Sequence, residues 1–342
     1  MMNFIFKKIK DRFSKESYSF GLDIGTSTIK FVKLKFSKDT IELCDFVSEQ
    51  TEINLEQAIK RITESRNAYR VNISVSGPST IIRYISFPKM NNEELKKSLR
   101  FEAQKYIPFP INELNLDSYI LKDNLPDNKM LLLLAAVKTE LMRQRIKLID
   151  NCGLKVYVLD IDSVALVNAF NFNYPQENAE KRKTVALLNM GASLTNLNVL
   201  EGDMPRLSRD IQIAGVKFTQ KLVDVLGVDF KAAEDLKLKP ESDKADKITK
   251  AIESVLTGLA AEIRTSFDYY ESQSSSTVDK IFLSGGGSLF PGLKDMLAGL
   301  LGIEVEYWDP LKKLIVPENL ASEKLKILSP QLAVAVGLAL RQ

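Results

Sequence analysis

The segment Asp23-Ile24-Gly25-Thr26-Ser27 has a counterpart at Asn189-Met190-Gly191-Ala192-Ser193, 166 residues further along the chain. Each copy follows an alternating apolar segment and precedes another, which predicts a glycine turn between two strands. One such turn alone is most simply an ordinary β-hairpin. The repeat indicates more, because the same turn chemistry lies at equivalent points of two halves. It predicts a duplicated α/β fold.

The chemistry of the two turns suits a polyphosphate. Glycine turns expose backbone N–H groups and let an anion approach closely. Hydroxyl side chains in and beside the turns add donors: Thr26, Ser27, Thr28, Ser193 and Thr195. Lys30 adds a positive charge, and Asp23 is suited to hold Mg²⁺ through water. Two facing turns would therefore grip phosphates from both sides.

A third glycine segment, Ser284-Gly285-Gly286-Gly287-Ser288, follows the apolar run Ile281–Leu283 and precedes Leu289 and Phe290. Such a turn admits a flat ligand against the backbone, with the two apolar side chains packed on its ring. A flexible linker is the alternative. It is disfavoured because apolar residues follow the glycines directly.

Composition narrows the function classes. The chain has 342 residues, enough for two domains, with 45% hydrophobic and 27% charged residues, as in soluble globular proteins. A net charge of +3 does not indicate a nucleic acid partner. The absence of histidine excludes Ser-His-Asp and Cys-His catalysis. Cys44 and Cys152 have no metal-site spacing, which favours a reduced, cytoplasmic setting.

The sequence leaves two interpretations of membrane contact. The longest apolar runs are Met130–Val137 and Ala333–Leu340. Both are shorter than the roughly 20 residues of a membrane span. The basic start Met2–Phe13 would place Ile5, Ile9 and Phe13 on one face of a helix, which suits contact with anionic lipid. A frayed basic tail is the other interpretation.

The sequence predicts that the chain is divided into six parts. They are a basic tail (1–17), a first subdomain (18–87), a small α+β insertion (88–156), a return to the first domain (157–180), a second domain (181–329) with a helical insertion at about 218–270, and a C-terminal helix closing on the first domain (330–342).

At its three glycine segments the sequence resembles the actin, Hsp70 and sugar-kinase superfamily. Arg209–Gly215 and Leu283–Leu293 are similar to actin segments. The resemblance implies duplicated actin-like (ribonuclease H-like) domains with a nucleotide cleft between them, and ATP with Mg²⁺ as ligands. Phe87–Met90 leading into Arg100–Pro110 resembles, more narrowly, the PilM family of actin-like type IV pilus assembly proteins.

The resemblance also implies roles for individual residues. The nucleotide-binding set is Asp23, Gly25, Thr26, Ser27, Thr28, Lys30, Gly191, Ala192, Ser193, Thr195, Gly215, Glu234, Lys237, Gly285, Gly286, Gly287, Ser288 and Phe290. Within it, Glu234 and Lys237 would reach the ribose. An exposed salt bridge is the alternative for that pair. Asp23 and Asn189 would face the metal through water.

Asn189 departs from the superfamily pattern, which has an acid there. An amide cannot act as a base, so nucleotide binding should survive this change better than hydrolysis. Asp162 is the other candidate catalytic carboxylate, at the position where relatives carry a water-orienting Glu. A helix N-cap is its alternative role. We therefore expect weak or absent ATPase activity.

The family resemblance implies a scaffold at the cytoplasmic face of the inner membrane that binds the cytoplasmic N-terminal peptide of PilN. Pilus motor and platform proteins and self-association are further expected contacts, and membrane association would run through partners. The peptide groove is expected near Tyr106, Ile107, Pro108 and Phe109. Alternatively, Ile107 and Phe109 fold into the insertion's own core. An FtsA-like cytoskeletal ATPase and a small-molecule kinase are the competing functions.

Overall fold

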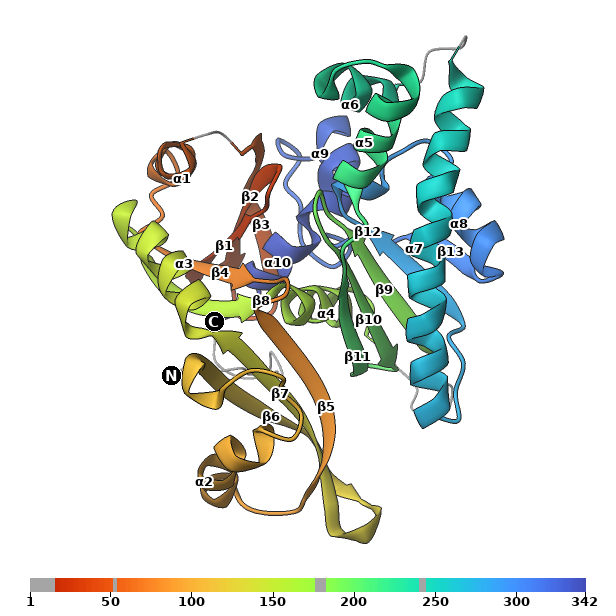
Figure 1. Ribbon diagram of the computed structural model, residues 1–342. Coiled ribbons are helices and arrows are strands. Elements are labelled where there is room, and N and C mark those ends of the chain that lie inside the picture. The colour runs from red at the N-terminus through yellow and green to blue at the C-terminus, as the bar shows by residue number, and fades with distance from the viewer. Residues whose placement is uncertain (1–15, 52–53, 176–182, 240–243) are drawn as a thin grey trace.

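The computed structural model describes residues 16–51, 54–175, 183–239 and 244–342 (Figure 1). Most of the basic tail and most of the polar stretch between the two predicted domains lie outside the described residues. Two large α/β domains stand beside each other, and a smaller β-rich part extends from the first of them.

The duplication predicted from the two glycine turns is confirmed by two sheets of the same design. The first sheet has the order β3-β2-β1-β4-β8 and the second β11-β10-β9-β12-β13. In each, three antiparallel strands continue into two parallel ones. The first sheet comprises β1 (Ser17–Ile24), β2 (Thr28–Phe36), β3 (Ile41–Gln50), β4 (Arg70–Val75) and β8 (Lys155–Ile161). The second comprises β9 (Thr184–Met190), β10 (Thr195–Glu201), β11 (Met204–Ile211), β12 (Lys280–Ser284) and β13 (Glu304–Tyr307).

Helices cover both faces of each sheet, because strands buried on both sides carry apolar residues facing each way. The outer face of the first sheet packs under α1 (Leu55–Glu64) and α3 (Thr139–Asn151). The outer face of the second packs under α5 (Gly215–Leu226), α6 (Phe230–Leu238), α7 (Ala245–Gln273) and α8 (Leu293–Leu301). Between the sheets lie α4 (Asp162–Asn173) and α10 (Ala333–Ala339), preceded by the short α9 (Glu323–Leu328).

Glycine allows the central helices to pack at very short range. A Cβ on Gly337 of α10 would lie 1.9 Å from the Ala165 carbonyl oxygen of α4. A Cβ on Gly21 of β1 would lie 2.1 Å from the Ala335 carbonyl oxygen of α10. The last helix is therefore held against both the first sheet and the helix that connects the two domains.

The insertion has its own three-stranded sheet in the order β5-β7-β6. It is built from β5 (Thr80–Pro88), α2 (Asn92–Ala103), β6 (Leu114–Leu125) and β7 (Lys129–Lys138). Its sheet thus begins at residue 80, earlier than the expected start at 88, because β5 pairs along its length with β7. The helix α3, expected within the insertion, packs instead on the first sheet. The division into domains otherwise stays a prediction.

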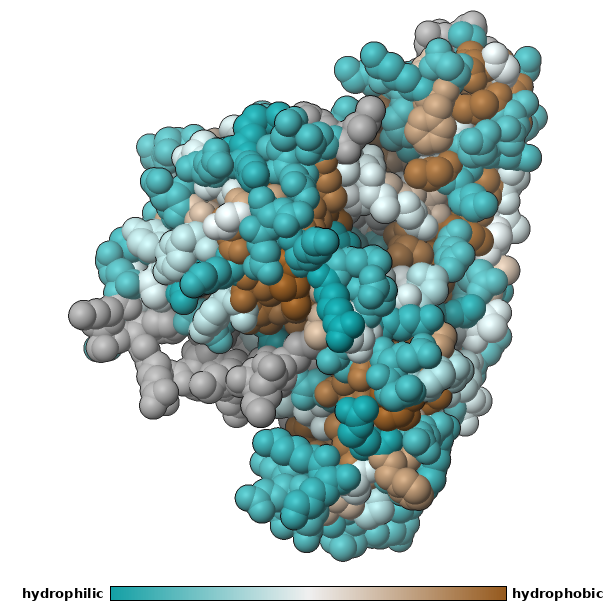
Figure 2. Space-filling model, turned by 60° about the vertical axis from the view of Figure 1, so that its left-hand side comes forward, coloured by the Kyte–Doolittle hydropathy of each residue, from teal (hydrophilic) through white to brown (hydrophobic). Residues whose placement is uncertain are grey.

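Figure 2 shows the side of the first domain, where hydrophobic residues reach the surface between broad hydrophilic areas. In the part of the chain that the structure describes, no helix is both long and apolar enough to cross a bilayer.

Candidate functional site

The two glycine turns face each other across the space between the domains. Each closes with the same hydrogen bond, from Gly25 N to the Thr28 carbonyl at 3.1 Å and from Gly191 N to the Leu194 carbonyl at 2.9 Å. Their tips touch, because the hydroxyls of Thr26 and Ser193 lie 2.8 Å apart. The two halves of the repeat therefore meet at one place.

The residues behind the two turns differ in charge. On the first hairpin Asp23 and Lys30 are cross-strand partners, and their carboxylate and ammonium groups lie 3.1 Å apart. On the second hairpin the equivalent partners are Asn189 and Asn196, joined by an amide hydrogen bond of 3.3 Å. The first hairpin thus carries an ion pair and the second a neutral pair.

Asn189 is held in place on both sides of its amide. Its Oδ1 accepts a hydrogen bond from the Ser284 hydroxyl at 3.1 Å, and its Nδ2 donates to Asn196. Asn196 in turn donates to a carboxylate oxygen of Asp210 at 2.6 Å. This network fixes the amide of Asn189, which cannot itself accept a proton from water at neutral pH, and ties the one acid in the network, Asp210, to Asn196.

Asp162 lies at the start of α4, directly after β8, with the hydroxyls of Ser74 and Ser76 bonded to its carboxylate. Its pKa is raised to about 6, chiefly by burial and then by the nearby negative charge of Asp23. Ile161 holds the N-cap position, and no side chain caps this helix. Asp162 is therefore not an N-cap.

A cation also approaches these acids. Burial lowers the pKa of the Arg145 guanidinium on α3, and the charges of Asp162 and Asp23 oppose that change. No motif in the sequence singles out Arg145, because α3 has the pattern of an ordinary amphipathic helix. The negative charge at this end of the first sheet is thus partly balanced from α3.

The third glycine segment packs tightly against the second turn. A Cβ on Gly285 would lie 2.3 Å from the Met190 carbonyl oxygen, and one on Gly287 would lie 2.5 Å from the Gly191 carbonyl oxygen. Gly215, at the start of α5, lies beside Gly191, to whose carbonyl its N–H donates at 3.1 Å. A Cβ at Gly285 or Gly287 would overlap these backbone atoms, so only glycine fits there, and one at Gly215 would lie a tight 3.2 Å from the Gly191 carbonyl oxygen.

Three expected ligand contacts are directed inward instead. Phe290 is 5% exposed and belongs to the core of the second domain, so its ring does not face the cleft. Ser288 is fully buried and donates to the Gly285 carbonyl at 2.6 Å. Thr195 is also buried, and its hydroxyl donates to the Ile213 carbonyl at 2.7 Å. Their roles are structural in the arrangement observed.

Glu234 and Lys237 on α6 form an ion pair of 2.7 Å, but it is not the exposed pair considered as the alternative. Lys237 is 4% exposed, and its ammonium group also donates to the Thr219 hydroxyl at 2.8 Å and towards the Gly215 carbonyl at 3.4 Å. Glu234 is partly buried: its side chain is 42% exposed, and the oxygen that meets Lys237 also accepts a hydrogen bond from the Thr219 hydroxyl. Lys237 thereby ties α6 to the start of α5.

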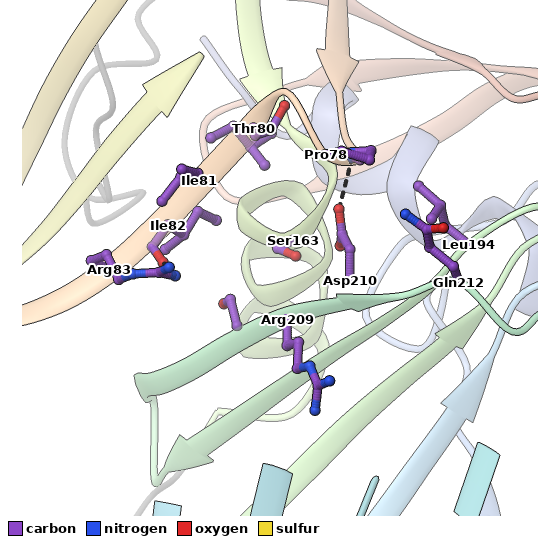
Figure 3. Close-up of a pocket in the computed structure, with 13 residues that line it drawn as sticks. Pro78, Thr80, Ile81, Ile82, Arg83, Ser163, Leu194, Arg209, Asp210 and Gln212 are labelled. Carbon is purple, nitrogen blue, oxygen red and sulfur yellow. Dashed lines mark hydrogen bonds between the residues drawn. The ribbon is translucent and has the colours of Figure 1, made fainter. Parts of the chain in front are cut away.

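Asp210, which was not singled out from the sequence, joins the two domains. One of its carboxylate oxygens accepts a hydrogen bond of 2.7 Å from Gly77 N, in the turn between β4 and β5. Figure 3 shows Asp210 pointing to this turn and Arg209 pointing away from it. The pocket beside them is lined by β5, β11 and the start of α4, including Ser163 and Gln212. Residue spacing alone gave no signal for this contact.

The expected peptide-groove residues lie in and around the insertion's own core. Ile107 is 6% exposed and Phe109 packs against the same cluster, with the Lys138 ammonium 4.4 Å from its ring centre. Tyr106 and Pro108 are exposed. The boundary between insertion and first domain has a different lining, namely the partly buried Tyr119, Leu121, Leu141 and Met142.

The donors of the cleft fit a magnesium nucleotide. The ammonium group of Lys30 lies 3.0 Å from where a Cβ on Gly25 would be, so the glycine leaves room for it over the turn. Among the described residues, no three acidic, cysteine or histidine side chains gather into a direct metal site. Mg²⁺ would thus rely on Asp23, water and phosphate oxygens, as this ion commonly does.

Comparisons with known proteins agree with this architecture. A family model described as "Type IV pilus assembly protein PilM" matches residues 21–342. A solved structure described as a PilM-PilN type IV pilus biogenesis complex is 30% identical, covers 94% of this chain and 98% of its own, and has a TM-score of 0.84. The ethanolamine utilization protein EutJ from Carboxydothermus hydrogenoformans is similar in fold alone, with 15% identity, coverage of 95% and 89%, and a TM-score of 0.55.

Proposed function

Because the chain belongs to the PilM family of type IV pilus assembly proteins, we propose that it is an ATP-binding scaffold that binds the cytoplasmic N-terminal peptide of PilN. It would act at the cytoplasmic face of the inner membrane, where the same platform would present motor proteins and further copies of the chain. The observation that carries the nucleotide part is the meeting of two matched glycine turns at Thr26 and Ser193.

In this proposal the two turns hold the phosphates. Lys30 exchanges its ion pair with Asp23 for a contact with a phosphate oxygen. The hydroxyls of Thr26 and Ser193 give up the hydrogen bond between them and donate to phosphate oxygens instead. Mg²⁺ supplies charge neutralisation between the phosphates and Asp23. The partly exposed Glu234 is placed to reach the ribose beside Gly215.

Hydrolysis should be slow. Asn189, where relatives carry an acid, is neutral and already bonded to Ser284 and Asn196. Asp162 is another acid near the cleft that could orient water, and its pKa is raised by burial and by the nearby charge of Asp23. We expect tight binding of Mg·ATP, measured by calorimetry, with a turnover far below the roughly 1 s⁻¹ at the low end of typical enzymes. Turnover at an ordinary enzymatic rate would contradict this part.

The peptide would bind between the insertion and the first domain. Within the described chain, β6 pairs on one side only, with β7, and so presents a strand edge to an extended peptide. Leu121 on β6 and Leu141 and Met142 on α3 offer apolar contacts beside that edge. This replaces the groove expected around Ile107 and Phe109, whose side chains pack within the insertion.

A binding titration with a fluorescent N-terminal PilN peptide tests this placement. Met142→Glu should weaken binding at least about tenfold, because an acid would be buried against apolar side chains. Ile327→Glu is the matched control, since Ile327 is 65% exposed on α9, far from the insertion. Equal binding by the two variants, with both folded, would place the peptide elsewhere. Loss of binding on Phe109→Ala alone would restore the original placement.

A further inference from the structure

A row of aromatic and cationic side chains crosses the first sheet at the end away from the glycine turns. It draws on strands β2, β1, β4 and β8, which lie side by side (Figure 1). In order of contact, the members are Tyr18, Lys33, Phe20, Tyr69, Arg70 and Tyr157, here called the aromatic–cation row.

Consecutive members of the row touch. The Lys33 ammonium lies 5.0 Å from the ring centre of Tyr18 and 5.6 Å from that of Phe20. The rings of Phe20 and Tyr69 meet edge to face at 6.5 Å. The Arg70 guanidinium lies 5.5 Å from the Tyr69 ring and 4.5 Å from the Tyr157 ring. Six groups from separate parts of the sequence therefore form one continuous surface feature.

The tyrosines of the row are exposed to solvent, unlike aromatic residues that belong to a core. Tyr18, Tyr69 and Tyr157 are 43%, 63% and 52% exposed, while Phe20 beneath them is buried. Tyrosine with lysine or arginine is the combination found where proteins meet the headgroup region of a bilayer, because each has an apolar body and a polar end. Lys155, exposed and two residues before Tyr157, adds positive charge.

The sequence before β1 is also rich in positive charge. Residues 1–15 precede β1 in the sequence, and they carry several basic residues against the single acid Asp11: Lys7, Lys8, Lys10, Arg12 and Lys15. Basic segments of this kind are attracted to anionic lipid. We propose that the aromatic–cation row docks directly on the surface of an anionic membrane.

A nucleic acid fits the row less well. Bases stack on open ring faces, whereas Arg70 and Lys33 already lie over the faces of the rings they contact. Phosphate and carbonyl groups of lipid headgroups can instead reach the cations and tyrosine hydroxyls from the edge. The proposal goes beyond the proposed function, in which the membrane is reached through partners.

Flotation of the full-length protein with lipid vesicles tests the proposal without any partner. We expect binding to vesicles of phosphatidylcholine with about one-third phosphatidylglycerol, weak binding to pure phosphatidylcholine, and loss of binding in high salt. The double variant Arg70→Glu/Tyr157→Ser should bind the anionic vesicles at least about fivefold more weakly, since each basic residue near the surface contributes about that factor.

The double variant Lys250→Glu/Tyr269→Ser is the matched control. It makes the same change in charge and removes a tyrosine that is 58% exposed on α7 of the second domain. Lys33→Glu/Tyr18→Ser, at the other end of the row, replaces the first variant if that one does not fold. Unchanged binding by folded row variants, equal binding to both vesicle types, or binding of single-stranded DNA in place of vesicles would each overturn the proposal.

Discussion

Replacing Gly337 by alanine should destabilise the protein more than any exposed substitution. The added methyl group would lie 1.9 Å from the Ala165 carbonyl oxygen and 2.5 Å from its carbonyl carbon. Both atoms belong to the backbone of α4, so no side-chain rotation relieves the contact. The two central helices would have to separate by roughly 1.5 Å to reach an ordinary van der Waals distance.

The size of the effect follows from two opposing contributions. Overpacking in a well-packed core costs about 1–3 kcal/mol, and more where backbone must move. Alanine regains about 1 kcal/mol over glycine within a helix. Because α4 and α10 lie in the core between the two sheets, separating them also loosens contacts on both sides. We expect a net loss of about 2 kcal/mol in the free energy of unfolding, at the upper end of this difference because two backbones must move apart.

Urea unfolding followed by circular dichroism measures this change. Gly299→Ala is the matched control, because Gly299 lies inside α8 and a Cβ there meets nothing within 4 Å. It should stabilise the protein by about 0.5–1 kcal/mol. Gly21→Ala, whose Cβ would meet the Ala335 carbonyl of α10, should resemble Gly337→Ala. A Gly337→Ala protein as stable as the wild type would refute the close packing of the central helices.

Three further outcomes are expected. Asp162→Asn should stabilise the nucleotide-free protein by about 1–3 kcal/mol at pH 7.5 but little near pH 4. The reason is that a folded pKa of about 6 lies above the unfolded value, so the wild type loses stability as pH rises between them. Denaturant unfolding with EDTA at both pH values checks the sign. Lys237→Met should cost about 1–3 kcal/mol in the free energy of unfolding by leaving its buried partners unpaired, and it should lower ATP affinity. Glu234→Gln, at the more exposed end of the ion pair, should affect stability less. Calorimetry with and without Mg·ATP separates the effect on stability from the effect on affinity. Single and double alanine variants of Thr26 and Ser193 should show a coupling of about 0.5–1 kcal/mol without nucleotide, and a cycle with no coupling would argue against contact between the turns.

The sequence identified the parts of the site that are local. A glycine turn between two alternating apolar segments is legible within about ten residues, so Gly25 and Gly191 were found and the duplicated fold followed from their repeat. The change from acid to amide at Asn189 was equally visible. The structure adds that the cross-strand partner differs as well: Asn189 pairs with Asn196, whereas Asp23 in the first half pairs with Lys30.

Burial was harder to predict. Phe290 and Ile107 each occur in a glycine- or proline-rich stretch, where an apolar side chain reads equally well as a ligand contact or as core. The structure packs both into cores. The choice depends on which distant residues cover the side chain, and this information lies in neither local segment.

By itself, then, the sequence determined the turns, their duplication and the chemistry of the ligands they suit, because each depends on neighbours along the chain. The tertiary structure alone decided the Gly77–Asp210 bond between domains, the lining of the boundary beside β6, and the aromatic–cation row that links Tyr18 to Tyr157. The first and third of these features join residues more than one hundred positions apart, and the second joins β6 to α3. Strand pairing and the packing of helices on the sheets bring such residues together, and no local spacing in the sequence predicts it.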